Sequence, residues 1–329
     1  MSKLYPVGVQ NFEKVILGGY EYVDKTALIY ELFNTGSYYF LSRPRRFGKS
    51  LLLSTLEAYA QGKKELFKGL ALEKLEKDWT VYPVLHLDLN TQKYDSPESL
   101  TSILNDNLCN WESRYGARES ETSLSLRFQG LIRRACEQTG RRVVILIDEY
   151  DKPMLQAIGN EDLQNEYRST LKAFYGALKS MDGCIRFALL TGVTKFGKVS
   201  VFSDLNNLRD ISMIDQYAEI CGISEKEVHA YFEEDIHELA TATGMSYEQA
   251  CAELKANYDG YHFTENAVGM YNPFSLLNTF ANRRFGSYWF ETGTPTYLVE
   301  LLKLHHYPIE DLEHIVTSQP VLDSIDTAS

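Results

Sequence analysis

Residues 38–50 have the sequence YYFLSRPRRFGKS, and the rest of the chain is organised around this stretch. Aromatic and apolar residues lead into an arginine-rich loop that ends in Gly48, Lys49 and Ser50, and an apolar run begins at Leu51. This order is typical of a strand, a phosphate-binding loop and a helix. Glycine lets backbone N–H groups approach a phosphate, lysine reaches the β- and γ-phosphates, and a serine hydroxyl binds Mg²⁺. The positive end of the following helix also favours an anion.

The loop departs from the general pattern at its first position. The usual motif is Gly-x4-Gly-Lys-Ser/Thr, and Arg43 stands where the first glycine is expected. Because that turn is tight, a basic strand-to-helix turn without a ligand is the alternative interpretation of the loop alone. Arg45 and Arg46 either add charge near the phosphates or make contacts outside the loop. The candidate nucleotide-binding residues are Arg45, Arg46, Phe47, Gly48, Lys49, Ser50 and Leu51.

A second segment supplies carboxylates. Residues 143–147 are consecutive aliphatic residues, which predicts a strand buried on both faces of a parallel sheet, and Asp148 and Glu149 follow directly. Because burying charge is costly, acids at the end of such a strand favour a functional role. Asp148 would hold Mg²⁺ together with Ser50, and Glu149 would take a proton from the attacking water. The alternative is a strand that exits to solvent, with Asp148 capping the next helix.

Two more strands are predicted, at residues 83–89 and 186–191. Asp88 lies near the carboxyl end of the first, where open α/β sheets bind ligands, although an edge-strand aspartate without a role is the favoured interpretation. Thr191 ends the second and is a candidate to bond the γ-phosphate or the attacking water. A turn threonine that bonds its own backbone explains Thr191 equally well.

Helical periodicity fills most of the remaining chain. Asp24 is expected to cap a helix that runs to about Asn34. Ser224 with Glu227 and Ser246 with Gln249 form two capping boxes. The helices are expected at 24–34, 51–61, within 91–140, at 162–180, 224–243 and 246–257, after Asn272-Pro273, and at 297–304.

The composition excludes several classes of protein. A length of 329 residues predicts two or three structural units, and 44% hydrophobic with 24% charged residues is ordinary for a soluble globular protein. The net charge of −12 argues against direct nucleic-acid binding. The five cysteines include no CxxC pair, as expected in a reducing compartment, and no apolar run approaches a membrane span. A cytoplasmic protein without a membrane partner is predicted.

Four separated blocks resemble one family in content and order. They are residues 22–26 (YVDKT), 43–50 (RPRRFGKS), 147–151 (IDEYD) and 191–196 (TGVTKF), and residues 203–208 and 271–275 extend the similarity. The chain is similar to the AAA-ATPase-like proteins of anaerobic bacteria, relatives of archaeal-type ATPases, whose own loop also carries arginine at the place of Arg43. The resemblance implies an α/β P-loop NTPase core with a parallel sheet flanked by helices, then a helical lid and a winged-helix-like unit. It places these domains at residues 1–209, 210–262 and 263–329.

Members of this family often continue into a PD-(D/E)XK nuclease-like domain, and no such continuation is expected within this chain. The residues and the resemblance together predict an ATP-binding protein that hydrolyses ATP with Mg²⁺ as a conformational switch or motor. Adenine over guanine rests on the resemblance alone. The expected catalytic residues are Glu149, Lys49 and Thr191, and the expected metal ligands are Ser50 and Asp148. The alternative is a non-hydrolysing nucleotide-dependent scaffold of a larger assembly, with a protein partner or self-association possible in either case.

Overall fold

The computed structural model describes residues 3–195, 201–202, 205, 207–264 and 269–288. The chain divides into two compact units. The first unit comprises Met1–Val81 with Asp210–Gly293, and the second comprises Tyr82–Arg209 with Thr294–Ser329. Along the chain, the short strand β5 (Arg209–Asp210) spans the junction between them.

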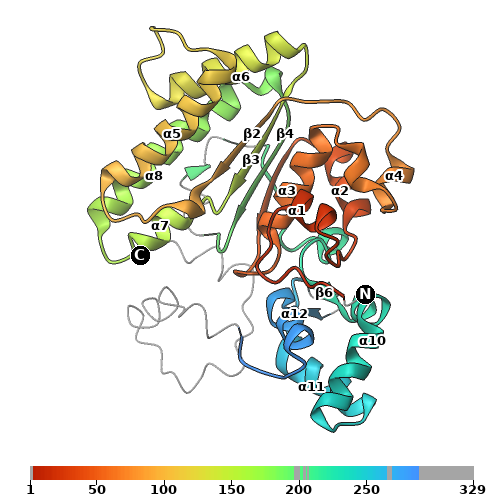
Figure 1. Cartoon of the computed structure of the whole chain (residues 1–329). Coiled ribbons are helices and arrows are strands. Elements are labelled where there is room, and N and C mark those ends of the chain that lie inside the picture. Colours follow the sequence, from red (N-terminus) through yellow and green to blue (C-terminus); the bar gives the residue numbers. More distant parts are fainter. Residues whose placement is uncertain (1–2, 196–200, 203–204, 206, 265–268, 289–329) are drawn as a thin grey trace. The chain divides into compact units, whose positions relative to one another are not determined.

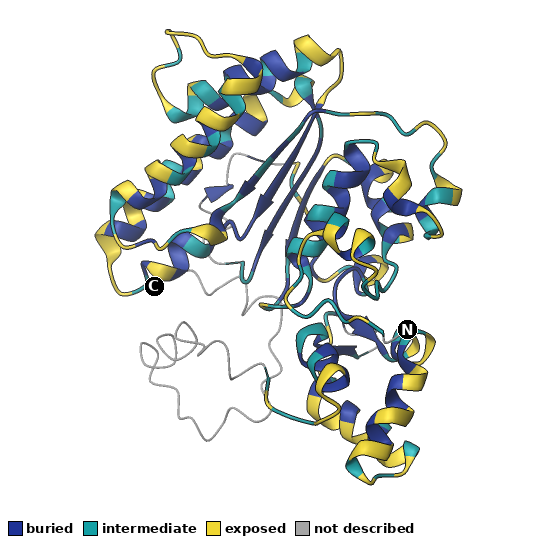
Figure 2. Cartoon of the chain, in the orientation of Figure 1, coloured by how far each residue is buried: buried dark blue, intermediate teal, exposed yellow. Residues whose placement is uncertain are grey.

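The second unit is built on parallel strands, which confirms the predicted α/β class. The strands are β2 (Val84–Asp88), β3 (Val143–Asp148) and β4 (Ile185–Gly192). β3 pairs with β2 on one side and β4 on the other, with Asp88 opposite Asp148 and Ile147 opposite Leu190. Every residue of β3 is buried (Figure 2), as the aliphatic run predicted for a strand covered on both faces.

Helices of the second unit pack together beside these strands (Figure 1). They are α5 (Pro97–Tyr115), α6 (Leu124–Thr139), α7 (Lys152–Gln156), α8 (Glu161–Ser180), and the short η2 (Leu89–Thr91) and η3 (Asp182–Cys184). Phe128 of α6 stacks on Phe174 of α8 with ring centroids 4.3 Å apart. The predicted helical crossover at 91–140 is therefore the pair α5 and α6.

The first unit begins with short helices around one strand. These elements are α1 (Phe12–Leu17), α2 (Thr26–Thr35), β1 (Tyr38–Ser42), α3 (Lys49–Ala60), η1 (Lys64–Phe67) and α4 (Ala71–Leu75). The predicted order of strand, loop and helix at residues 38–61 is confirmed. Beside β1, the N–H of Ile211 donates to the carbonyl of Phe40 at 2.9 Å, so the chain returns to this strand after residue 209.

The remainder of the first unit is a small helical part with its own core. Its elements are η4 (Asp215–Tyr217), β6 (Ile223–Ser224), α10 (Glu225–Thr243), α11 (Tyr247–Tyr258), β7 (Met270–Tyr271) and α12 (Pro273–Asn282). Both predicted capping boxes are present, at Ser224 and at Ser246. Phe232, Ile236 and Leu276 are fully buried in the core of this part, and the outer faces of α10 and α11 are exposed (Figure 2).

One capping prediction is wrong in detail. Lys25, not Asp24, occupies the N-cap position of α2, and no side chain caps that helix there. Asp24 instead accepts hydrogen bonds at 2.8 Å from the N–H of Thr26 and, with its other oxygen, from the N–H of Ala71. Thr26 in turn accepts from the N–H of Leu72 at 3.0 Å. The two side chains therefore satisfy the first backbone donors of α4, a helix distant in sequence.

Other predictions fall outside the described residues. These are the helix at 297–304, most of the block at 203–208 and most of the winged-helix-like unit at 263–329. In the part of the chain that the structure describes, no helix is long and apolar enough to cross a bilayer.

Candidate functional site

The loop between β1 and α3 places the side chain of Lys49 back over its own backbone. The Lys49 amine donates to the carbonyls of Arg43 at 3.0 Å and Pro44 at 3.1 Å, and the residue is 3% exposed. Gly48 is the N-cap residue of α3, and its backbone lies in the left-handed region at φ 95°. Because glycine has no side chain, no side chain caps the helix at this position. Backbone N–H groups at a helix start can donate to phosphate oxygens, and a lysine amine beside them adds positive charge.

Arg43 is buried beneath the loop instead of facing a phosphate. Its guanidinium donates to the carbonyls of Ser42 at 2.9 Å, Ser212 at 2.7 Å and Tyr217 at 3.3 Å. It also lies 3.9 Å from the centroid of the Phe263 ring, and the residue is 1% exposed. Burial lowers the pKa of Arg43 to about 10, so the side chain remains a cation at neutral pH. The residue that departs from the general motif is thus an internal support of the loop.

Phe47 anchors the other end of the loop to the helical part of the first unit. Its ring contacts Tyr261 and Phe263 edge-on, with centroids 4.8 and 5.3 Å away. Its carbonyl accepts from the N–H of Gly222 at 3.1 Å. A Cβ on Gly222 would come within 2.5 Å of the Phe47 ring, and this glycine has φ +91°, so the close approach requires glycine.

The two remaining arginines of the loop differ in their surroundings. The Arg46 guanidinium lies 4.1 Å from the centroid of the Phe274 ring, which is a contact outside the loop. Burial, and then the neighbouring charge of Arg45, lower the pKa of Arg46. Arg45 itself is exposed. Of the pair, Arg45 is the one whose side chain solvent reaches most freely.

In the second unit, the carboxyl ends of β3 and β4 bring Asp148 and Thr191 together. The Thr191 hydroxyl donates to Asp148 at 2.6 Å, and the two residues are 0% and 2% exposed respectively. Thr191 therefore bonds a carboxylate on the neighbouring strand, a partner that the sequence did not indicate. Asp148 is buried on the strand and α7 starts only after Asp151, so the alternative in which Asp148 caps the next helix is wrong.

Glu149 follows Asp148 in a turn with an unusual backbone. Its φ of 53° lies in the left-handed region, which a non-glycine residue adopts at a cost, and the residue is buried. The N–H of Tyr150 donates to the carbonyl of Thr191 at 2.9 Å, which ties this turn to the end of β4. Strained backbone of this kind is held by its surroundings and is common where a side chain must be aimed.

Asp151 braces the same turn from within. Its carboxylate accepts from the N–H of Val193 at 3.1 Å and from both the N–H and the hydroxyl of Thr194, at 2.7 and 2.9 Å. All three donors lie after β4, so Asp151 joins the turn after β3 to the residues that follow β4. A Cβ on Gly192 would meet the Tyr150 ring at 2.5 Å and Asp151 at 2.8 Å, so glycine is needed there as well.

Asp88, which the sequence favoured as an edge-strand aspartate without a role, lies next to Asp148. It ends β2 directly opposite Asp148 of β3, because the two parallel strands are in register there. Burial raises the pKa of Asp88, and the negative charge of Asp148 adds to this effect although the N–H of Asn90 opposes it. Two acids at the ends of adjacent parallel strands are a familiar cation-binding arrangement. The sequence signal for this position was the alternating pattern at 83–89, which predicted a strand with Asp88 near its carboxyl end.

The sequence-predicted residues thus form two groups. Gly48, Lys49 and Ser50 lie at the start of α3 in the first unit, whereas Asp148, Glu149 and Thr191 lie at the strand ends of the second. Over the described residues, there is no group of three His, Cys, Asp or Glu side chains arranged to hold a metal ion unaided. Mg²⁺ sites in proteins commonly combine one or two carboxylates with phosphate and water oxygens.

Comparison with known proteins identifies the family of the chain. The chain is 40% identical over 326 residues, 98% of its length, to a protein of Azotobacter chroococcum mcd 1 named "Uncharacterized protein in vnfD 5'region". The chain spans 61% of the length of that relative. The family described as predicted AAA-ATPase matches residues 6–202, which include the loop between β1 and α3, Asp148 and Glu149 at the end of β3, and Thr191. On this match, the chain belongs to the AAA-ATPase-like family.

Proposed function

We propose that the protein binds ATP with Mg²⁺ and hydrolyses it, using the binding energy and hydrolysis as a conformational switch. The observation that carries the proposal is the loop itself. The buried Lys49 amine donates to the carbonyls of Arg43 and Pro44 at the start of α3, where Gly48 is the N-cap residue. That geometry favours a phosphate ligand, because the backbone N–H groups at a helix start and a neighbouring lysine amine both attract an anion.

The residues have distinct roles in this proposal. Lys49 and the N–H groups at the start of α3 hold the β- and γ-phosphates, and Ser50 and Asp148 hold Mg²⁺. Glu149 accepts the proton of the attacking water. Thr191 orients the Asp148 carboxylate through its 2.6 Å hydrogen bond, and Asp88 supplies further negative charge to the cation. Arg45 adds positive charge near the phosphates.

Two substitutions test these roles. Lys49→Ala should abolish measurable ATP binding, because the phosphates lose their only lysine partner in the loop. Glu149→Gln should retain ATP binding but lower kcat by about a hundredfold or more, because the amide cannot accept the proton. Isothermal titration calorimetry measures binding, and phosphate release measures turnover.

The matched controls are exposed residues of the same units. Lys64→Ala lies in η1 of the first unit, and Glu166→Gln lies on α8 of the second. Both should bind and hydrolyse ATP as the parent chain does. Hydrolysis by Glu149→Gln at the parent rate would show that Glu149 is not the base.

A non-hydrolysing nucleotide-dependent scaffold is the second candidate. The buried Arg43 favours it, because the loop has a support that differs from the general phosphate-loop pattern. Phosphate release separates the candidates, since the scaffold would bind Mg–ATP without measurable turnover. The five cysteines, all within the described residues, form no disulfide, which is compatible with action in a reducing cytoplasm. A protein partner or self-association would receive the signal.

A further inference from the structure

The turn that carries Glu149 is tied to the end of β4, and all of its residues lie in the second unit. The N–H of Tyr150 donates to the carbonyl of Thr191 at 2.9 Å, and the Tyr150 hydroxyl donates to the carbonyl of Thr194 at 3.2 Å. A hydrogen bond from the N–H of Lys152 to the carbonyl of Glu149, at 3.0 Å, closes the turn itself. The backbone on the C-terminal side of Glu149 is therefore fixed to a neighbouring strand end.

Asp151 contributes to this connection instead of capping its own helix. It is the N-cap residue of α7, a position where aspartate commonly accepts from the first N–H groups of the helix, yet its side chain makes no such bond. One carboxylate oxygen instead accepts from the N–H of Val193 at 3.1 Å and from the N–H and the hydroxyl of Thr194 at 2.7 and 2.9 Å. Asp151 is fully buried, so these hydrogen bonds form away from bulk solvent, where they are stronger.

Glu149 needs such support because of its backbone conformation. Its φ of 53° lies in the left-handed region, which is costly for glutamate and persists only where surrounding contacts hold it. The contacts of Tyr150 and Asp151 begin one and two residues after Glu149, so they act on the peptide units that set its direction. Without these contacts the turn would relax to a commoner conformation, and the Glu149 side chain would point elsewhere.

We propose that Asp151 and Thr194 are positioning residues that aim the Glu149 carboxylate during ATP hydrolysis. The inference rests on the proposed function, in which Glu149 is the base, and adds how that base is oriented. A carboxylate that accepts a proton from water works only when it is aligned with that water. Loss of the alignment therefore lowers the rate of the chemical step and leaves the affinity for Mg–ATP nearly unchanged.

Two substitutions remove this support from its two sides. Asp151→Ala removes the acceptor of the bonds from residues 193 and 194, and Thr194→Val removes the hydroxyl bond alone with little change of side-chain shape. We expect kcat to fall about tenfold or more for Asp151→Ala and about three- to fivefold for Thr194→Val, with the Kd of Mg–ATP within about twofold of the parent value. Thr194→Ser retains the hydroxyl and should recover most of the parent kcat. Phosphate release measures kcat, and calorimetry measures Kd.

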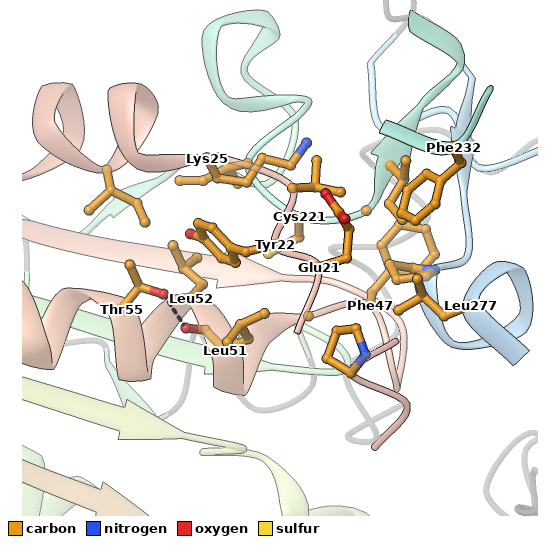
Figure 3. Close-up of a pocket in the computed structure, with 18 residues that line it drawn as sticks. Glu21, Tyr22, Lys25, Phe47, Leu51, Leu52, Thr55, Cys221, Phe232 and Leu277 are labelled. Carbon is orange, nitrogen blue, oxygen red and sulfur yellow. Dashed lines mark hydrogen bonds between the residues drawn. The ribbon is translucent and has the colours of Figure 1, made fainter. Parts of the chain in front are cut away.

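The matched control for Thr194→Val is Thr55→Val in the first unit. Thr55 lies in α3, at a pocket of about 90 Å³ beside Gly48, and its hydroxyl donates to the carbonyl of Leu51 at 2.7 Å (Figure 3). Because Thr55 is buried, this variant also removes one buried threonine hydroxyl and its hydrogen bond. Thr55→Val should keep kcat within about twofold of the parent value, because the lost bond joins two residues of one helix.

A double-mutant cycle shows whether Asp151 acts through Glu149. In the Glu149→Gln background the base is already absent, so the addition of Asp151→Ala should change kcat by less than about twofold. A residue that only stabilised the fold, or that acted on another group, would lower kcat by the same factor in both backgrounds. Thermal unfolding establishes that each variant is folded at the assay temperature. If Asp151→Ala does not fold, Thr194→Val in the two backgrounds supplies the cycle.

The outcomes separate the two levels of the proposal. A parent-like kcat in both Asp151→Ala and Thr194→Val, or an equal loss in the presence and absence of Glu149, would overturn the positioning role and leave the ATPase proposal standing. Absence of ATP hydrolysis by the parent chain would overturn the ATPase proposal and the positioning role together.

Discussion

Arg43 shows how one side chain can replace a motif residue without removing the motif. A glycine at this position normally relieves crowding, whereas here the side chain passes into the interior and bonds three carbonyls. The Phe263 ring covers its guanidinium. A buried cation is stable only when its donors are used, and these contacts use most of them. The Nε atom has no hydrogen-bond partner among the described residues.

Substitution of Arg43 by glycine restores the general motif and should nevertheless damage the protein. Three hydrogen bonds from a charged donor and an aromatic contact are lost, so the free energy of unfolding should fall by about 3 kcal/mol or more. Urea unfolding measures the change. Arg45→Gly, at an exposed neighbouring position, is the control and should cost well under half as much. An Arg43→Gly variant as stable as the parent would contradict this role.

The local sequence marks the acids at the end of β3 more clearly than the acid at the end of β2. Asp148 and Glu149 follow an unbroken aliphatic run, so local sequence marks them clearly. Asp88 ends a strand of mixed polarity, and it became a candidate only because the structure places it opposite Asp148. The partner of Thr191 was equally hidden, because a hydrogen bond between neighbouring parallel strands joins residues 43 positions apart. Both contacts depend on how neighbouring strands align, and a local sequence pattern does not determine that alignment.

The segment from Asp24 to Thr26 stabilises a helix to which it is not adjacent. Its two side chains accept from Ala71 and Leu72, at the start of α4. α4 has no side-chain cap of its own, so these bonds replace one. The motif therefore has a structural explanation that is sufficient without a ligand. The neighbouring Lys25 adds an ion pair with Glu227, which itself belongs to the capping box of α10.

Asp24→Asn tests whether the hydrogen bonds from residues 71 and 72 to Asp24 and Thr26 stabilise the start of α4. The amide keeps one acceptor but cannot accept from both Thr26 and Ala71, so unfolding free energy should fall by about 1–2 kcal/mol. Amide exchange at residues 71 and 72 should accelerate, while exchange in α5 and α6 should not change. Asp78→Asn, an exposed change just after α4, is the control. Unchanged amide-exchange protection at residues 71 and 72 would show that these hydrogen bonds do not stabilise α4.

The helices and strands themselves were largely readable from the sequence. The predicted helices at 162–180, 224–243 and 246–257 correspond to α8, α10 and α11 within a residue or two. Their apolar spacing and their Ser or Asn caps act locally, so a local pattern is enough to locate them. The strands at 83–89, 143–147 and 186–191 were equally clear.

For the molecule as a whole, bound Mg–ATP should raise stability by mass action. If the ligand binds only the folded chain, a concentration one hundred times Kd adds about 2.7 kcal/mol to the free energy of unfolding. The Tm should therefore rise with ligand concentration, and chelation of Mg²⁺ by EDTA should remove most of the increase. Differential scanning fluorimetry with ATP, ADP and no metal gives the comparison. A Tm that is independent of ATP concentration would count against nucleotide binding.

Long-range contacts also determine how the chain is grouped. The helical part packs with the N-terminal segment through Lys3 and Tyr5, which both bond Asp235, and through the pair of Lys25 and Glu227. The first unit is consequently assembled from two pieces separated by 128 residues, 82–209. The proposed domains at 1–209, 210–262 and 263–329 stay a prediction.

The amino-acid sequence established the α/β class, the order of strand, loop and helix around Lys49, the acids at the end of β3 and the capping boxes. All of these depend on neighbours within a few residues, where propensity, periodicity and cap chemistry act. Folding in three dimensions was needed to bury Arg43 against Phe263, to pair Thr191 with Asp148, to set Asp88 opposite Asp148 and to form the pocket beside Gly48. Each of these joins residues far apart in the chain, and packing and strand register select such partners.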